Sequence, residues 1–210
     1  MVSFIELIKN KNIAFVGPSS SLLGKNLGKL IDSYDIVIKL NNFHKLSSED
    51  YGNKVDILFY NFYKSTPDNS IKEHNTKFIM ASHSFDNHRD NLYHFKQSQI
   101  QNCEIHHELF LHNSIDEYFV NLLKSKPWKT SGFNVMCLLL NNLNNIHSLT
   151  LFGIDFNYYS YNKNYRDIGV VGHDMKHERE LFKKMYFKFK DSNKIHINDK
   201  GFLEYINDHS

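Results

Sequence analysis

The sequence predicts an α/β fold, a single Rossmann-like parallel sheet flanked by helices. Short apolar segments alternate with helix-like segments, starting with a strand at 13–17, a helix at 22–32 and a second strand at 35–40. A strand, a helix and a strand within ~30 residues are typical of right-handed crossover units, which build parallel sheets. Several of these strands also end in a polar residue or a small turn, as at the ligand-binding edge of such sheets.

The remaining elements follow from the same patterns. Further strands are expected at 56–60, 77–81, 148–152 and 194–197, with a weaker one at 103–107. Helical spacing of apolar residues predicts helices at 114–124, 131–143 and 173–190, and a terminal turn or helix at 203–206. No repeat or linker divides the chain, so we expect one domain over 1–210. Candidates for a small lid or acceptor-side insertion are 82–126 and the tyrosine-rich loop 157–171.

Composition and charge exclude several classes of protein. The net charge of +2 is too small to indicate nucleic acid or an anionic membrane as the partner. The two cysteines, Cys103 and Cys137, argue against a disulfide framework, because Cys137 lies in an apolar helical segment. No apolar run reaches the ~20 residues of a membrane-spanning helix, and residues 1–11 lack the features of a signal peptide. We therefore expect a cytoplasmic protein without a transmembrane segment.

Polar or small residues follow four of the predicted strands, namely Gly17, Asn41, Asn61 and Asp155. Carboxyl ends of parallel strands meet at one edge of the sheet, so we expect these residues to converge on one crevice. An unpaired buried amide costs ~1–3 kcal/mol, so asparagine after a buried strand indicates a partner. Neutral amides can bind hydroxyls, pyrimidine edges and phosphate oxygens, so these asparagines favour a nucleotide as the ligand. The alternative is that each asparagine is a helix cap or a turn residue.

The segment Thr130-Ser131-Gly132 opens an apolar helix. Backbone N–H groups at a helix start carry partial positive charge and suit a phosphate or a carboxylate; a plain N-cap is the alternative. The turn at Gly17 is neither a P-loop nor a dinucleotide fingerprint, because the further glycines and the lysine of those motifs are absent.

His173 is the candidate general base. It lies at the start of a predicted helix, where the helix dipole favours the neutral imidazole that can accept a proton. The chain has 13 histidines, so an inert surface or cap position is the alternative. Glu178 is expected to be a structural hydrogen-bond partner. We expect no metal site, because the single carboxylate of Asp155-Phe156-Asn157 is a poor ligand set for a hard cation.

These segments together resemble the sialyltransferases, in the order that the family has them. Residues 13–41 look like the large sialylmotif of the animal-type family, and 51–56 fit its continuation. Residues 130–153 look like the small sialylmotif, and 171–178 match the very small motif, in which a glutamate follows the histidine by five residues. Phe59-Tyr60-Asn61 and Gly153-Ile154-Asp155-Phe156 are also similar to compact bacterial sialyltransferases that use CMP-sialic acid.

The resemblance implies a GT-A-variant fold and one glycosyltransferase catalytic domain. It implies an inverting, metal-independent transfer of sialic acid from CMP-sialic acid to a hydroxyl of a glycan or glycolipid acceptor, with no cofactor beyond the CMP-sugar donor. It makes His173 the general base and Glu178 its structural motif partner. The donor-binding residues that it implies are Gly17, Ser19, Asn41, Asn61, Thr130, Ser131, Gly132, Gly153, Asp155, Tyr158, Tyr159 and Tyr161.

The sequence departs from the family pattern at two places. Pro18 stands where the family usually has asparagine after the first glycine, so that donor contact passes to Ser19. The His-Tyr-Tyr motif that usually precedes the very small motif is absent as such. The alternatives are transfer of another CMP-linked keto-sugar acid such as Kdo, an inactive nucleotide- or glycan-binding module, and a metal-dependent phosphohydrolase using His173-Asp174.

Overall fold

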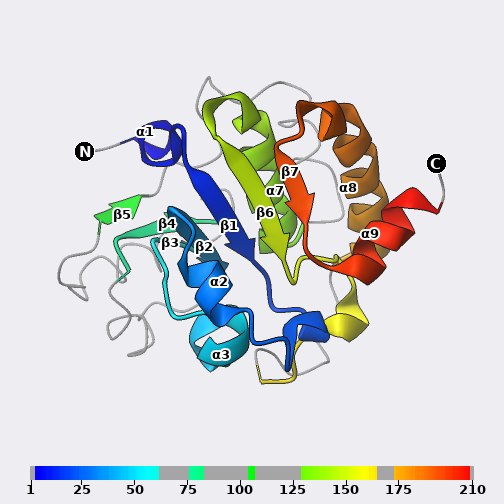
Figure 1. Cartoon of the computed structure of the whole chain (residues 1–210), viewed down its shortest axis with the longest axis horizontal. Helices are drawn as coiled ribbons and strands as arrows, with labels where there is room; N and C mark the ends of the chain where they lie inside the picture. Colours follow the sequence, from blue (N-terminus) through cyan, green and yellow to red (C-terminus); the bar gives the residue numbers. More distant parts are fainter. Residues whose placement is uncertain (1–2, 62–75, 83–103, 107–128, 165–172, 209–210) are drawn as a thin grey trace.

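The computed structural model describes residues 3–61, 76–82, 104–106, 129–164 and 173–208. These residues form a seven-stranded sheet in the order β5-β4-β3-β2-β1-β6-β7 (Figure 1). Every pair of neighbouring strands is parallel, which confirms the predicted α/β fold with a single parallel sheet. The strands are β1 (Asn12–Val16), β2 (Ile36–Leu40), β3 (Ile57–Tyr60), β4 (Phe78–Ala81), β5 (Glu104–His106), β6 (Ser148–Phe152) and β7 (Ile195–Ile197).

Helices cover both faces of the sheet. They are α1 (Phe4–Ile8), α2 (Gly28–Asp32), α3 (Ser48–Tyr51), α7 (Ser131–Asn141), α8 (Met175–Phe189) and α9 (Lys200–Asn207). Side chains alternate between the faces along a strand. Ile13 and Phe15 of β1 therefore join the core with α7 and α8, whereas Ala14 and Val16 join the core with α2 and α3. In Figure 1, α2 lies in front of the sheet and α7 behind it.

The strand order changes direction at β1, where β6 pairs on the side opposite to β2. Strands β2 to β5 extend the sheet on one side of β1, and β6 and β7 extend it on the other. Ligands of open α/β sheets bind outside the carboxyl ends of the strands at such a switch point. Gly17 follows β1 and Gly153 follows β6, and a Cβ on Gly17 would lie 2.3 Å from the Gly153 carbonyl oxygen. Only glycine fits this approach of two main chains.

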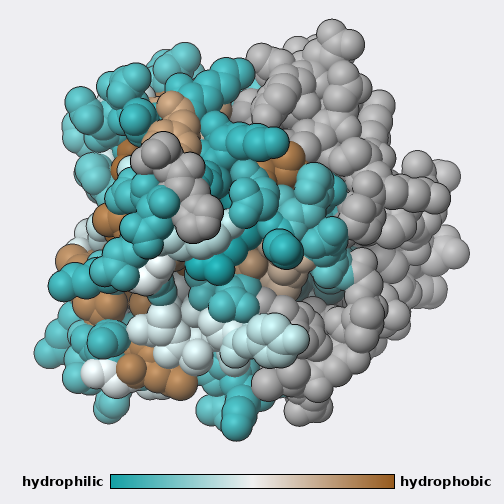
Figure 2. All heavy atoms as spheres, turned by 90° about the vertical axis from the view of Figure 1, so that its right-hand side faces the viewer, coloured by the Kyte–Doolittle hydropathy of each residue, from teal (hydrophilic) through white to brown (hydrophobic). Residues whose placement is uncertain are grey.

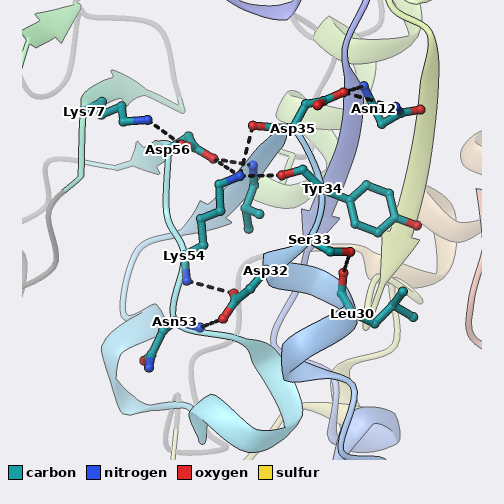
Figure 3. A network of polar contacts seen from close by, with 11 residues as sticks. Asn12, Leu30, Asp32, Ser33, Tyr34, Asp35, Asn53, Lys54, Asp56 and Lys77 are labelled. Atoms are coloured by element: carbon teal, nitrogen blue, oxygen red, sulfur yellow. Dashed lines mark hydrogen bonds and ion pairs between the residues drawn. The ribbon is translucent and has the colours of Figure 1, made fainter.

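The amino edge of the sheet is tied together by charged side chains (Figure 3). The buried Asp56 carboxylate accepts a hydrogen bond from Val37 N at 2.9 Å and pairs with Lys54 at 3.5 Å and Lys77 at 3.1 Å. Asp32 accepts hydrogen bonds from the main-chain N–H groups of Asn53 and Lys54. These contacts hold the starts of β2, β3 and β4, at the edge opposite to the predicted site.

The prediction of one helix over 22–32 is wrong. A 3-10 turn at Ser20–Leu22 is followed by α2 from Gly28, because Gly24 and Asn26 have φ angles of +69° and +53°. A left-handed residue interrupts a right-handed helix. The predicted helix at 114–124, nearly all of the segment 82–126 and residues 165–171 of the tyrosine-rich loop lie outside the described residues.

No helix within the described parts of the chain is both long and apolar enough to cross a membrane. On the side where α8 and α9 lie, the surface is mainly hydrophilic, with separate hydrophobic patches (Figure 2).

Candidate functional site

Asn41, at the end of β2, contacts both Asn61, at the end of β3, and the start of α7. Asn41 accepts a hydrogen bond from Asn61 N at 2.9 Å through its Oδ1 atom. Its Nδ2 atom lies 3.5 Å from the Ser131 hydroxyl oxygen. Asn41 adopts a φ of +38°, which is uncommon for a residue other than glycine. The carboxyl ends of β2 and β3 and the first turn of α7 therefore share one polar cluster.

The start of α7 has the geometry of an anion site. Thr130 is the N-cap, and its hydroxyl oxygen accepts a hydrogen bond from Phe133 N at 3.1 Å. Among the described residues, the N–H groups of Ser131 and Gly132 have no hydrogen-bond acceptor. Of the described residues, a Cβ on Gly132 would meet only Leu40 Cδ1 at 3.6 Å and Thr130 Oγ1 at 3.9 Å. Free N–H groups at a helix start are suited to an anionic ligand.

Glu178 joins the first turn of α8 to this site. It is 1% exposed, and its two carboxylate oxygens accept hydrogen bonds from Thr130 N and Thr130 Oγ1, both at 2.6 Å. Burial raises the pKa of Glu178 to about 7, against the opposing effects of the two Thr130 bonds and the nearby Lys129. The expected structural role of Glu178 thus has a definite partner, the N-cap of the helix that starts the candidate site.

His173 lies two residues before the start of α8, next to its N-cap. It is exposed, and Asp174 after it is the N-cap of α8, accepting a hydrogen bond from His177 N at 2.9 Å. Glu178, five residues further on, accepts hydrogen bonds from Thr130 and so anchors this end of α8 to the start of α7. His173 lies at the same end of α8. The structure therefore places the histidine on the same side of the molecule as the Thr-Ser-Gly turn.

Ser19 and Asp155 bond to each other at the switch point. The Ser19 hydroxyl, 3% exposed, donates to Asp155 Oδ2 at 3.0 Å. The Asp155 carboxylate also accepts from Asn157 N at 3.1 Å, and burial raises its pKa above the usual range. The main-chain oxygen of Ser19 accepts from the Tyr51 hydroxyl at 2.7 Å. These contacts hold the loops after β1 and β6 together.

The tyrosines of the 157–164 segment take different positions. Tyr161 forms an antiparallel bridge with Ser19 and so belongs to the joined loops. Tyr159 is 86% exposed. Tyr158 begins the 3-10 turn Tyr158–Ser160. For Tyr158, the structure describes the main chain and not the side chain. Asn162, next to Tyr161, is buried and donates to the Tyr51 hydroxyl at 3.2 Å.

Two buried polar residues of the candidate site, Ser82 and Asn134, are not among those predicted from the sequence. Ser82 follows β4 and its hydroxyl donates to Ser131 Oγ at 3.0 Å. Asn134 of α7 donates to the Ser82 carbonyl oxygen at 2.8 Å. The signal for Ser82 was present, because it follows an apolar strand as Asn41 and Asn61 do. Within the described ranges, no group of three or more His, Cys, Asp or Glu side chains is placed to hold a metal ion.

Comparison with solved structures gives the same fold. A mammalian sialyltransferase crystal structure is 18% identical, with a TM-score of 0.63 over 95% of this chain and 74% of that chain. A variant of the sialyltransferase CST-II in complex with CMP is 17% identical, with a TM-score of 0.63 over 93% of this chain and 84% of that chain. CstII from Campylobacter jejuni in complex with the substrate analogue CMP-3FNeuAc is 16% identical, with a TM-score of 0.60 over 93% and 84%.

Comparison at the level of sequence identifies the family. No curated protein is matched. The family model described as glycosyltransferase family 29 (sialyltransferase) matches residues 9–189, a range that contains every element from β1 to α8. This chain therefore belongs to glycosyltransferase family 29, the sialyltransferases.

Proposed function

We propose that this protein transfers sialic acid from CMP-sialic acid to a hydroxyl of a glycan, with inversion at the anomeric carbon and without a metal ion. The observation that carries the proposal is the convergence of Asn41, Asn61 and the Thr130-Ser131-Gly132 turn at the carboxyl edge of a family 29 fold. Among the similar structures, one holds CMP-3FNeuAc and another holds CMP and a trisaccharide acceptor.

In the proposed site, the donor lies along the carboxyl edge of the sheet. The amides of Ser131 and Gly132 hold an anionic oxygen of the donor, and Asn41 and Asn61 lie beside the nucleotide. At the switch point the main chains of Gly17 and Gly153 approach each other closely, with the Ile154 and Leu22 side chains packed beside them. These neutral hydrogen-bond donors stabilise the charge that develops on the leaving phosphate.

His173 is the proposed general base. Its imidazole takes the proton from the acceptor hydroxyl as that oxygen bonds to the anomeric carbon of the donor. The bond from this carbon to the donor phosphate oxygen breaks, and its electron pair leaves with CMP. Attack on the face opposite to the leaving phosphate inverts the anomeric centre.

The test compares two histidines at the start of α8. We expect His173→Ala to lower transfer from CMP-sialic acid at least ~100-fold, because general base catalysis contributes about 10²–10⁴-fold, and to leave CMP binding unchanged. His177→Ala, an exposed histidine four residues along, is the matched control and should retain activity. Product mass measures transfer, and calorimetry measures CMP binding.

Three results would contradict parts of this proposal. Unchanged turnover in His173→Ala would remove the assigned base. Loss of transfer on addition of EDTA would contradict the metal-independent reaction. CMP binding without transfer or hydrolysis of any CMP-sugar would indicate a binding module and not an enzyme. Transfer from CMP-Kdo in place of CMP-sialic acid would show that the proposed donor is wrong.

A further inference from the structure

The hydroxyl of Ser131 has two hydrogen-bond donors directed at it. Ser82 Oγ donates to Ser131 Oγ at 3.0 Å, and Asn41 Nδ2 lies 3.5 Å from the same oxygen. The two donors come from the ends of β4 and β2, on either side of β3 in the sheet. Ser131 itself is the first residue of α7.

A serine hydroxyl has one proton to donate and two lone pairs that accept. With Ser82 and Asn41 at the two lone pairs, the proton of Ser131 points away from both. This proton is then the one donor of the Ser131 hydroxyl that is left for another partner, in addition to the main-chain N–H groups of Ser131 and Gly132. Three donors at one helix start select a ligand atom that only accepts, such as an oxygen of an ionised phosphate.

Ser82 is built into the protein as a fixed group. Its side chain is fully buried, with 0% exposure. Its main-chain N–H donates to the Tyr60 carbonyl at 3.0 Å, and its carbonyl accepts from Asn134 Nδ2 at 2.8 Å. Both main-chain bonds fix the position from which the Ser82 hydroxyl reaches Ser131.

We infer that Ser82 is a positioning residue that turns the Ser131 hydroxyl proton toward a phosphate oxygen of the bound nucleotide. Ser82 acts through Ser131 and does not touch the ligand in this arrangement. The inference rests on the proposed function, since it assumes that CMP binds at the start of α7. It adds a reason why the site prefers an ionised phosphate over a neutral group.

The test uses CMP and cytidine, which differ by the phosphate alone. In Ser82→Ala the Ser131 hydroxyl loses one of the two donors that fix its orientation, so its proton is no longer held toward the ligand, and CMP should bind about 5- to 20-fold more weakly, in the range of one weakened bond to a charged group. Cytidine binding should change less than twofold. The main-chain bonds of residue 82 are retained in this variant, and Ser82→Cys, with a weaker donor, should lose less.

A double-mutant cycle separates positioning from a general structural effect. Ser131→Ala should lose at least as much CMP affinity as Ser82→Ala, and the double variant should lose no more than Ser131→Ala alone, because Ser82 acts through Ser131. Ser148→Ala removes a serine bond to Asn12 at the opposite edge of the sheet and is the control, with no expected change.

Separate outcomes overturn the inference and the proposed function. Equal losses for CMP and cytidine, or additive losses in the double variant, would overturn the role of Ser82 while transfer by the unaltered protein persists. If the unaltered protein neither binds CMP nor uses a CMP-sugar, the proposed function itself fails.

Discussion

At the scale of the residue, Glu178 is the most constrained group of the site. Its carboxylate is buried, and both of its oxygens are used by one residue, Thr130. Burial without an adequate counter-charge favours the protonated form of a carboxyl group. The contact that anchors α8 to Thr130 therefore depends on whether the Glu178 carboxyl group is protonated.

The raised pKa of Glu178 predicts a pH dependence of stability. Because the pKa is about 7 in the folded state and ~4.3 in the unfolded state, the native state binds the proton more tightly. The free energy of unfolding should therefore fall as the pH rises from about 4.5 to 7, by on the order of 2–3 kcal/mol from this group. Urea unfolding at pH 5 and pH 8 measures the difference.

Glutamine at position 178 isolates this contribution. Glu178→Gln cannot ionise, so its free energy of unfolding should lack that part of the decrease between pH 5 and pH 8. Glu204→Gln, at an exposed position of α9, is the control and should keep the slope. Equal slopes in the original protein and in Glu178→Gln would show that Glu178 does not titrate in this range.

At the scale of the element, the first turn of α7 carries the proposed ligand site. The N-cap Thr130 uses its hydroxyl for the helix and for Glu178, which leaves the next two amides for a ligand. The described packing around α7 does not require glycine at position 132, because a Cβ there meets only ordinary contacts at 3.6 and 3.9 Å within the described residues. Glycine at this position would allow a ligand to approach the main chain closely, because it has no side chain.

We expect Gly132→Ala to separate stability from binding. Alanine in place of a helical glycine should raise the free energy of unfolding by roughly 0.5–1 kcal/mol. The added methyl group fills the space beside the amides, so CMP should bind at least ~10-fold more weakly. Thermal unfolding and calorimetry give the two quantities.

Gly201 provides the control for that substitution. It lies in α9, where a Cβ would meet only Asp199 Oδ1 at 3.5 Å. Gly201→Ala should be similarly stabilised and should bind CMP normally. Normal CMP binding by Gly132→Ala as well would mean that the donor does not approach this amide.

At the scale of the whole molecule, the two wings of the sheet meet where β1 pairs with β6. The residues after these strands, Gly17 and Gly153, bring their main chains into close approach, and Gly17 N donates to the Phe152 carbonyl at 2.7 Å. The loops beyond them are joined by the bond of Ser19 to Asp155. The chain segments that follow β1 and β6 are therefore held together at this junction.

Gly17→Ala should destabilise the whole fold. Its Cβ would lie 2.3 Å from both the Gly153 carbonyl oxygen and Ile154 Cδ1, and the carbonyl can move only if the two strands separate. We expect a loss of about 2–4 kcal/mol in the free energy of unfolding, measured by urea titration. Gly24→Ala, with a φ of +69° and no atom of the described residues within 4 Å of the added Cβ, should lose only about 1–2 kcal/mol. Equal losses would show that the close approach costs nothing.

The sequence by itself determined the parallel sheet and most of its strands, because burial on both faces of a strand leaves a local apolar run between polar ends. The same logic located Asn41 and Asn61, which follow β2 and β3. It did not locate the break in the helix predicted at 22–32, where left-handed residues at Gly24 and Asn26 outweighed the apolar spacing.

Only the tertiary structure decided which polar groups bond to one another. Ser19 and Asp155 are 136 residues apart, Ser82 and Ser131 are 49 apart, and Thr130 and Glu178 are 48 apart. Each pair is joined because strand order and helix docking bring distant segments to one edge, and hydrogen bonds form only within a few ångströms. Periodicity along a chain contains no information on such distances.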